Sequence, residues 1–174
     1  MSGATVAAGS ASAPSGETAL LLAILDQAYD HVSWHGTNLR GSIRRVSAKQ
    51  AAWRPAPGRH NIWELTVHAA YWKYAAWRRL TGRTRGSFPI KGSNWFPRPM
   101  PHGTNEAAWR SDRLLLDQMH GLLREAVKGL SPKGLRQTPP GSKVSNVSLL
   151  SGVAAHDLYH AGQIQVLKKL SPGR

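Results

Sequence analysis

Two histidines, His156 and His160, stand four positions apart near the carboxyl end of the sequence. On a helix this spacing places both imidazoles on one face, about one turn apart, which suits two ligands of one metal ion. Both occupy apolar-face positions, where a polar ring is costly unless it has a partner. The alternative is a pair of core histidines bonded to neighbouring groups. A third histidine, His68, lies in the middle of an apolar stripe on another segment, and three histidines facing one interior favour a metal site.

The stretch 156–160 reads His-Asp-Leu-Tyr-His and resembles the H-E-x-x-H motif of metalloproteases, with Asp157 in place of the catalytic glutamate. Two observations oppose a protease. The aspartate is one methylene shorter, and residues 161–174 contain no His, Asp or Glu that could be a downstream third ligand. The third ligand must then come from upstream, where His68 is best placed. Three histidines with an open fourth position are typical of a catalytic site, so we predict a catalytic centre.

Proton transfer at such a site falls to few side chains, because carboxylates are scarce near the histidines. We predict His35 and Tyr159 as the catalytic candidates. His35 lies on the apolar stripe of the first predicted helix, where it is interpreted as a fourth ligand, an acid–base group or a bonded core histidine. Tyr159 directly precedes His160 in the sequence.

Three further side chains lie close to the predicted ligands. Glu64 stands one turn before His68 and would orient that imidazole or bind the metal, but a helix-capping role is favoured. Gln163, three residues after His160, either offers its amide to the site or fills the end of the bundle. Trp72 is expected to line a pocket one turn beyond His68. No role is assigned to the other histidines, His31, His60, His102 and His120.

The elements that must position these residues are helices, because apolar residues recur every three and four positions in four segments. These segments are residues 18–46, 61–80, 105–130 and 146–170. None alternates with the period of two that a half-buried strand shows. The sequence therefore predicts an all-α four-helix bundle. The connection 81–104 is rich in aromatic residues and proline, and we expect it to pack on the bundle as a long crossover that leaves the second and third helices parallel.

The composition fits one domain of 174 residues with 41% hydrophobic side chains. Residues 1–16 are mostly Ala, Ser and Gly without charge, and we expect a disordered tail there, followed by the bundle domain over 17–174. The tail lacks the basic start and leucine-rich stretch of a secretory signal, and no apolar run is long enough to span a membrane, so a cytoplasmic location is predicted. The absence of cysteine excludes disulfides, thiolate metal sites and a cysteine nucleophile.

Charge suggests a different class of function. The net charge is +14, and residues 31–105 contain thirteen Lys or Arg but one acid, Glu64. A basic surface of this kind is compatible with a non-enzymatic nucleic-acid-binding or stress-response bundle. No recognition module appears, and the positive charges concentrate in connections and at helix ends, where they also compensate helix dipoles. We therefore favour the metal site over nucleic acid.

Two stretches carry a resemblance to a known family. They are residues 63–72, Trp-Glu-Leu-Thr-Val-His-Ala-Ala-Tyr-Trp, and residues 156–164, His-Asp-Leu-Tyr-His-Ala-Gly-Gln-Ile. Together they resemble the DinB-like superfamily of metalloenzymes (DinB/YfiT), over nearly the whole chain after the tail. The resemblance implies a four-helix bundle, a homodimer, and a divalent metal bound by His68, His156 and His160.

The resemblance also bears on activity. Family members of known activity are transferases or isomerases that use a low-molecular-weight thiol. We therefore expect a metal-dependent transferase or hydrolase acting on a small-molecule substrate, with such a thiol as a candidate partner. Imidazole ligands suit zinc and nickel, with iron as the alternative metal.

Overall fold

The computed structural model describes residues 14–99 and 103–172, and these residues form helices and connections without any strand. This confirms the predicted all-α class. The helices are α1 (Gly16–Tyr29), α2 (Leu39–Ser42), α3 (Ala48–Ala52), α4 (Ile62–Thr81), α5 (Glu106–Lys128), α6 (Pro132–Arg136) and α7 (Asn146–Leu170). Within the described ranges, none of them is both long and apolar enough to cross a bilayer.

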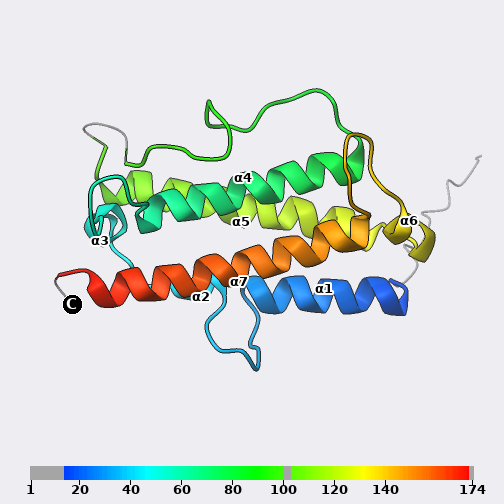
Figure 1. Ribbon diagram of the computed structural model, residues 1–174, viewed down its shortest axis with the longest axis horizontal. Helices are drawn as coiled ribbons and strands as arrows, with labels where there is room; N and C mark the ends of the chain where they lie inside the picture. The colour runs from blue at the N-terminus through cyan, green and yellow to red at the C-terminus, as the bar shows by residue number, and fades with distance from the viewer. Residues whose placement is uncertain (1–13, 100–102, 173–174) are drawn as a thin grey trace, which may run out of the picture.

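The four long helices, α1, α4, α5 and α7, lie side by side along the longest dimension of the molecule (Figure 1). Helix α4 packs on α5 and α7, and α1 packs on the other sides of the same two helices. Helices α4 and α5 run in the same direction, because their connection returns along the length of the molecule before α5 begins. The predicted crossover and its parallel helix pair are therefore confirmed.

Helix α4, which carries His68, has a specific capping interaction at its start and a glycine that ends it. The Asn61 side chain accepts a hydrogen bond from the Glu64 backbone N–H, and the Glu64 carboxylate accepts one from the Asn61 N–H, which completes a capping box. At the other end Gly82 adopts φ 64°, a left-handed conformation that glycine reaches without strain. The predicted boundaries, 61 and 80, lie within one residue of those observed.

The first predicted helix, 18–46, is wrong as a single element. Helix α1 ends at Tyr29, residues 30–38 form a loop, and two short helices follow. Asn38 and Ser47 cap these short helices with their side chains, and Gly36 adopts φ 95°, which a helix cannot accommodate. The apolar spacing continued through the loop by coincidence, since Val32 is almost fully exposed.

The connection between α4 and α5 packs on the bundle, as predicted. Its Phe88 and Phe96 side chains are buried in the same hydrophobic cluster as Trp63 of α4 and Trp109 of α5. The loop therefore has a fixed path over α4, and this path brings its residues 94 and 95 to the histidines described below.

Two predictions fall wholly or mainly on residues that the structure does not describe. The disordered tail was placed at 1–16, whereas the description begins at Pro14 and α1 begins at Gly16. His102 belongs to the segment 100–102, which lies outside the described residues.

Candidate metal centre

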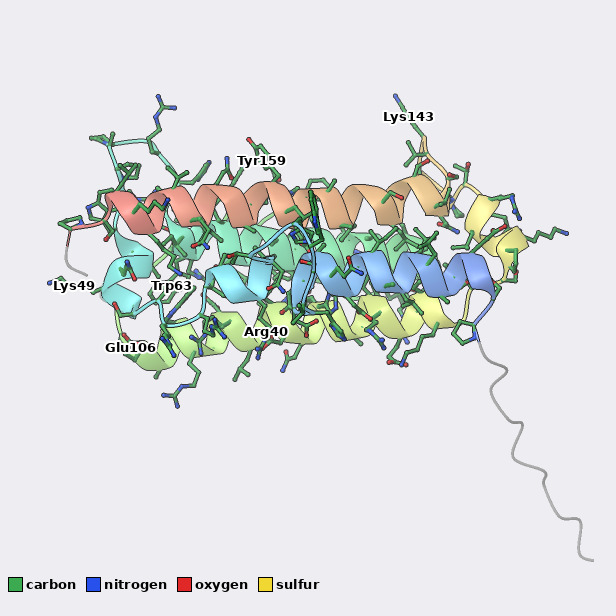
Figure 2. The ribbon with its side chains drawn as sticks, turned by 90° about the horizontal axis from the view of Figure 1, so that it is seen from below. Arg40, Lys49, Trp63, Glu106, Lys143 and Tyr159 are labelled. Carbon is green, nitrogen blue, oxygen red and sulfur yellow. The ribbon has the colours of Figure 1, made fainter. Side chains whose placement is uncertain are left out.

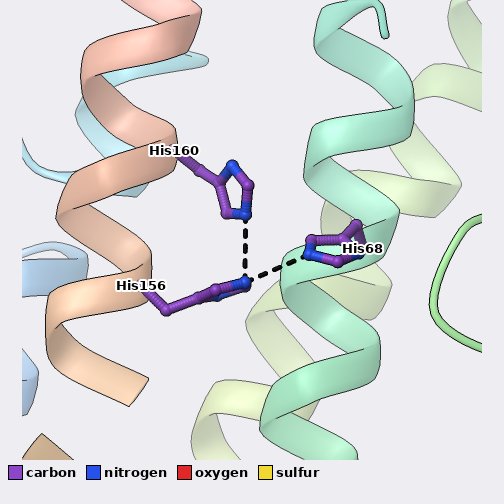
Figure 3. A group of neighbouring side chains, drawn as sticks. All are labelled: His68, His156 and His160. Carbon is purple, nitrogen blue, oxygen red and sulfur yellow. Dashed lines mark hydrogen bonds between the residues drawn. The ribbon is translucent and has the colours of Figure 1, made fainter. Parts of the chain in front are cut away.

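His68, His156 and His160 converge between α4 and α7 (Figure 3). His68 lies in the middle of α4, while His156 and His160 project from consecutive turns of α7. The His156 Nε2 atom lies 3.1 Å from Nε2 of His68 and 3.0 Å from Nε2 of His160. The structure therefore brings together the three residues that were predicted from the sequence as ligands.

Hydrogen bonds on the far side of two rings define where their protons lie. The His68 Nδ1–H donates to the backbone oxygen of Asn94 at 2.8 Å, and the His160 Nδ1–H donates to Oε1 of Gln163 at 2.7 Å. A neutral imidazole protonated on Nδ1 presents a bare lone pair on Nε2. His156 has at most one Nε2 proton to offer two such neighbours. The cluster thus holds more lone pairs than protons, which is the electronic arrangement that a cation completes.

Burial keeps these imidazoles neutral. Desolvation lowers the pKa of His68 to about 4 and the pKa of His156 to about 3, and the neighbouring histidines of the cluster reinforce both shifts. Burial also lowers the pKa of His160. A neutral imidazole is the form that binds a metal ion, so the site needs no deprotonation step at neutral pH.

Two of the three distances between ligand atoms match those around a tetrahedral ion, and all three ligand atoms lie within 4.8 Å of one another. Zinc bound to imidazole at about 2.0–2.1 Å spaces its nitrogen ligands about 3.3 Å apart. The two Nε2 separations, 3.0 and 3.1 Å, are close to that value. Acceptors on the outer nitrogens, here Asn94 and Gln163, are the usual support of metal-binding histidines because they fix the tautomer and the ring orientation.

Aromatic residues wall the cluster on the side of the crossover. The Trp95 indole stacks on His68 with ring centroids 3.8 Å apart and planes 11° apart. His60 stacks on the same indole at 3.6 Å and must lie on its other face, because two rings cannot occupy one face at these distances. The Trp72 Nε1–H donates to the Asn94 side-chain oxygen at 3.0 Å. Asn94, with φ 60°, therefore links the loop to both His68 and Trp72.

A fully buried ion pair lies next to the cluster in sequence. The Lys73 ammonium of α4 donates to the Asp157 carboxylate of α7. The ammonium also lies 3.3 Å from Nδ1 of His120 and 4.6 Å from the centre of the Tyr29 ring. Because the Asp157 carboxylate is paired with the Lys73 ammonium, it does not take the place of the glutamate base in the metalloprotease motif. This agrees with the sequence argument against a protease.

The two predicted catalytic side chains lie in different settings. His35 is an exposed residue of the loop 30–38, so the premise that a continuous helix presents it to the bundle interior is wrong. Within the described ranges no contact joins it to the three histidines. Tyr159 points outward from α7 (Figure 2) and is 64% exposed, but its ring centre lies 5.2 Å from that of His160.

Glu64 and Gln163, the two polar residues near the predicted ligands, have different roles. Glu64 caps α4 and forms a salt bridge with Arg54, whose guanidinium donates to it at 2.8 Å and 2.5 Å, and it lies outside the histidine cluster. The favoured capping interpretation is therefore confirmed. The Gln163 amide oxygen accepts a hydrogen bond from His160. Of the two interpretations of Gln163, the one in which its amide serves the site is therefore confirmed.

Sequence reasoning missed the residues that support the site. Asn94 and Trp95 belong to a connection whose path no residue pattern specified. His120, to which no role was assigned, is buried and stacks on Tyr29 with ring centres 3.8 Å apart. Lys73 could have indicated a buried polar cluster from the sequence, since a lysine in the middle of an apolar helical face needs a buried partner.

The family comparison agrees with this geometry. The model of the DinB superfamily matches residues 31–164, which is more than half of the chain and includes all three histidines. Comparisons with curated proteins and with solved structures gave no match. The length of the family match, together with the helical fold, shows that this chain belongs to the DinB superfamily.

Proposed function

We propose that this protein is a divalent-metal-dependent enzyme in which His68, His156 and His160 hold one zinc or nickel ion. The observation that carries the proposal is the convergence of three Nε2 atoms, two of them freed by hydrogen bonds on the opposite nitrogen. We further propose a small-molecule transferase or hydrolase reaction, with a low-molecular-weight thiol as the nucleophile in the transferase case.

The donor set determines what a bound metal would contribute. All three ligands are neutral, so a divalent ion would keep its full charge and supply a Lewis acid that lowers the pKa of a water or thiol. Because the chain contains no cysteine, a thiol nucleophile must come from outside the protein. Three protein ligands leave room for such a partner.

The surrounding residues have distinct tasks in this proposal. Asn94 and Gln163 hold the protons of His68 and His160 on Nδ1, away from the centre. Trp95 excludes water from one face of His68. His156 is the half-buried member of the three, so access from solvent is expected on its side. Tyr159, at the outer edge of His160, is the remaining candidate for exchanging a proton with solvent.

Cobalt substitution tests the thiol part of this proposal. Metal-free protein would be loaded with Co²⁺ and titrated with N-acetylcysteine, with N-acetylserine as the matched control. Binding of the thiol to the metal gives a sulfur-to-cobalt charge-transfer band in the near ultraviolet, which we expect for the wild type with the thiol alone. The same band in His68→Ala would show that the histidines are not the site. A cobalt-loaded wild type without the band would leave the hydrolase reaction as the proposal.

A further inference from the structure

A cavity of about 540 Å³ lies beside the carboxyl-terminal half of α4, under the start of the crossover. Pro140, from the connection between α6 and α7, closes part of its rim. The volume is in the range of small-molecule pockets, about 300–1,000 Å³. Aromatic and basic side chains dominate its lining, namely Tyr71, Tyr74, Phe88, Arg78, Arg79 and Arg83.

The three arginines of this cavity are each held by an aromatic ring of α4. The guanidinium carbon of Arg78 lies 5.8 Å from the centre of the Tyr74 ring, and that of Arg79 lies 5.9 Å from Trp72. The guanidinium carbon of Arg83 lies 4.9 Å from the centre of the Trp77 ring. A guanidinium that rests on a ring face keeps its N–H edge free for a second partner, and two parallel N–H groups match a carboxylate or phosphate.

Among the residues that the structure describes, no carboxylate forms a salt bridge with these three arginines. The sequence contains no Asp or Glu between Glu64 and Glu106. Arg78 is occupied in shaping the cavity, because its Nε and one terminal nitrogen donate to the backbone oxygens of Arg83 and Thr84 at 3.1 and 2.8 Å. For the Arg79 and Arg83 guanidiniums, the described part of the chain provides neither a carboxylate nor a hydrogen-bond acceptor.

We propose that this cavity binds the oxyanion group of a small molecule, a carboxylate or a phosphate. Arg79 and Arg83 provide the charged N–H donors, Arg78 fixes the connection that closes the cavity, and Tyr71 and Tyr74 provide flat apolar walls. The helix dipole gives a simpler reason for arginine at the end of α4, but it does not require a cavity or stacked guanidiniums.

The position of Trp72 connects this cavity to the histidine cluster. The Arg79 guanidinium lies over its ring, and its ring centre lies 6.3 Å from that of His68, with the two ring planes 71° apart. The Trp72 indole, which does not itself line the cavity, therefore neighbours both Arg79 and the cluster. This step rests on the proposed function, since it makes the cavity the anchor for the acidic end of a substrate or thiol whose other end reaches the metal.

Calorimetric titration of metal-free protein tests the anion site by itself. The probes are inorganic phosphate and succinate, at constant ionic strength and in a buffer without other oxyanions, because screening would otherwise change with the titrant. We expect saturable binding of at least one probe, weakened about tenfold or more in Arg79→Gln and in Arg83→Gln. Arg85→Gln, which removes the same charge from the connection that follows α4 at a residue outside the cavity lining, should change the affinity by less than about twofold.

Each outcome decides the proposal. Tighter binding of phosphate identifies a phosphate ester as the ligand class, and tighter binding of succinate identifies a carboxylate. Absence of saturable binding by both probes, or equal weakening in Arg85→Gln, would overturn the anion site. His68→Ala should bind the probes as the wild type does, so a failure of the metal proposal would leave this result intact. Circular dichroism of each variant shows whether the helices are retained.

Discussion

Lys73 and Asp157 form an ion pair across the interior of the bundle, with 0% and 1% of their side chains exposed. Lys73 lies five residues after His68 on α4, and Asp157 directly follows His156 on α7. The pair therefore joins the two helices that carry the histidine cluster, close to the cluster itself. A charge buried this deeply tolerates only a narrow range of helix positions, so the pair helps to fix how α4 faces α7.

The first prediction concerns the stability that depends on this pair. Lys73→Met should lower the free energy of unfolding by about 3–5 kcal/mol, because it leaves the Asp157 carboxylate buried without a counter-charge. Adding Asp157→Leu to Lys73→Met should restore part of the loss. Urea unfolding followed by circular dichroism measures both. The control is Lys128→Met, which breaks the exposed Lys128–Glu125 pair at 2.6 Å and should cost less than about 1 kcal/mol. A double variant less stable than Lys73→Met would contradict this account.

The second prediction concerns the outer support of the metal ligands. Gln163→Ala removes the acceptor of the His160 Nδ1–H, so the ring loses its fixed tautomer and orientation. Zinc affinity, measured by competition with a coloured chelator, should fall about 10- to 100-fold while the fold is kept. Gln165→Ala removes the same side chain two residues later on α7 and is the matched control. Equal affinities of the two variants would show that Gln163 does not support the site.

The third prediction concerns stability in acid. Burial, reinforced by the charge of Lys73, lowers the pKa of His120 to about 3. In an unfolded chain a histidine has a pKa near 6.5. Between about pH 6.5 and pH 3, the unfolded state therefore binds a proton at residue 120 that the native state does not bind. The free energy of unfolding must therefore decrease as the pH falls through this window.

A variant isolates this contribution. His120→Gln cannot bind the proton, and its free energy of unfolding should depend less steeply on pH than that of the wild type, by about 1.4 kcal/mol per pH unit between about pH 6 and pH 4. Urea unfolding at several pH values measures the slopes. His35→Gln, in an exposed loop position, is the control and should match the wild type. Identical slopes for His120→Gln and the wild type would show that His120 is not held neutral.

Much of the fold follows from local sequence signals. The segment 146–170 was predicted with the bounds that α7 has, and the capping box of Asn61 and Glu64 marks the start of α4. The first segment failed because apolar spacing by itself does not show a break. The break depends on side-chain and glycine geometry at Gly36 and Asn38, and an apolar residue such as Val32 can stand in an exposed loop at a helical interval.

The candidate site, like the fold, has parts that the sequence predicts and parts that it does not. The ligands could be predicted because residue type and a spacing of four on a helix determine both chemistry and direction. The Asn94 contact could not be predicted, since a backbone oxygen has no residue signature and its position depends on the path of the crossover. The partnership of Lys73 and Asp157 depends on how two helices rotate against each other, which a single sequence does not reveal.

The measurement that tests the metal centre most directly is elemental analysis of the protein purified without a nickel column. We expect about one divalent ion per chain in the wild type, because three converging imidazoles form a preorganised site. His68→Ala should lose most of that metal, and His31→Ala, which removes an exposed histidine outside the cluster, should keep it. A wild type that contains no more metal than His68→Ala, and takes up none on dialysis against zinc, would contradict the account.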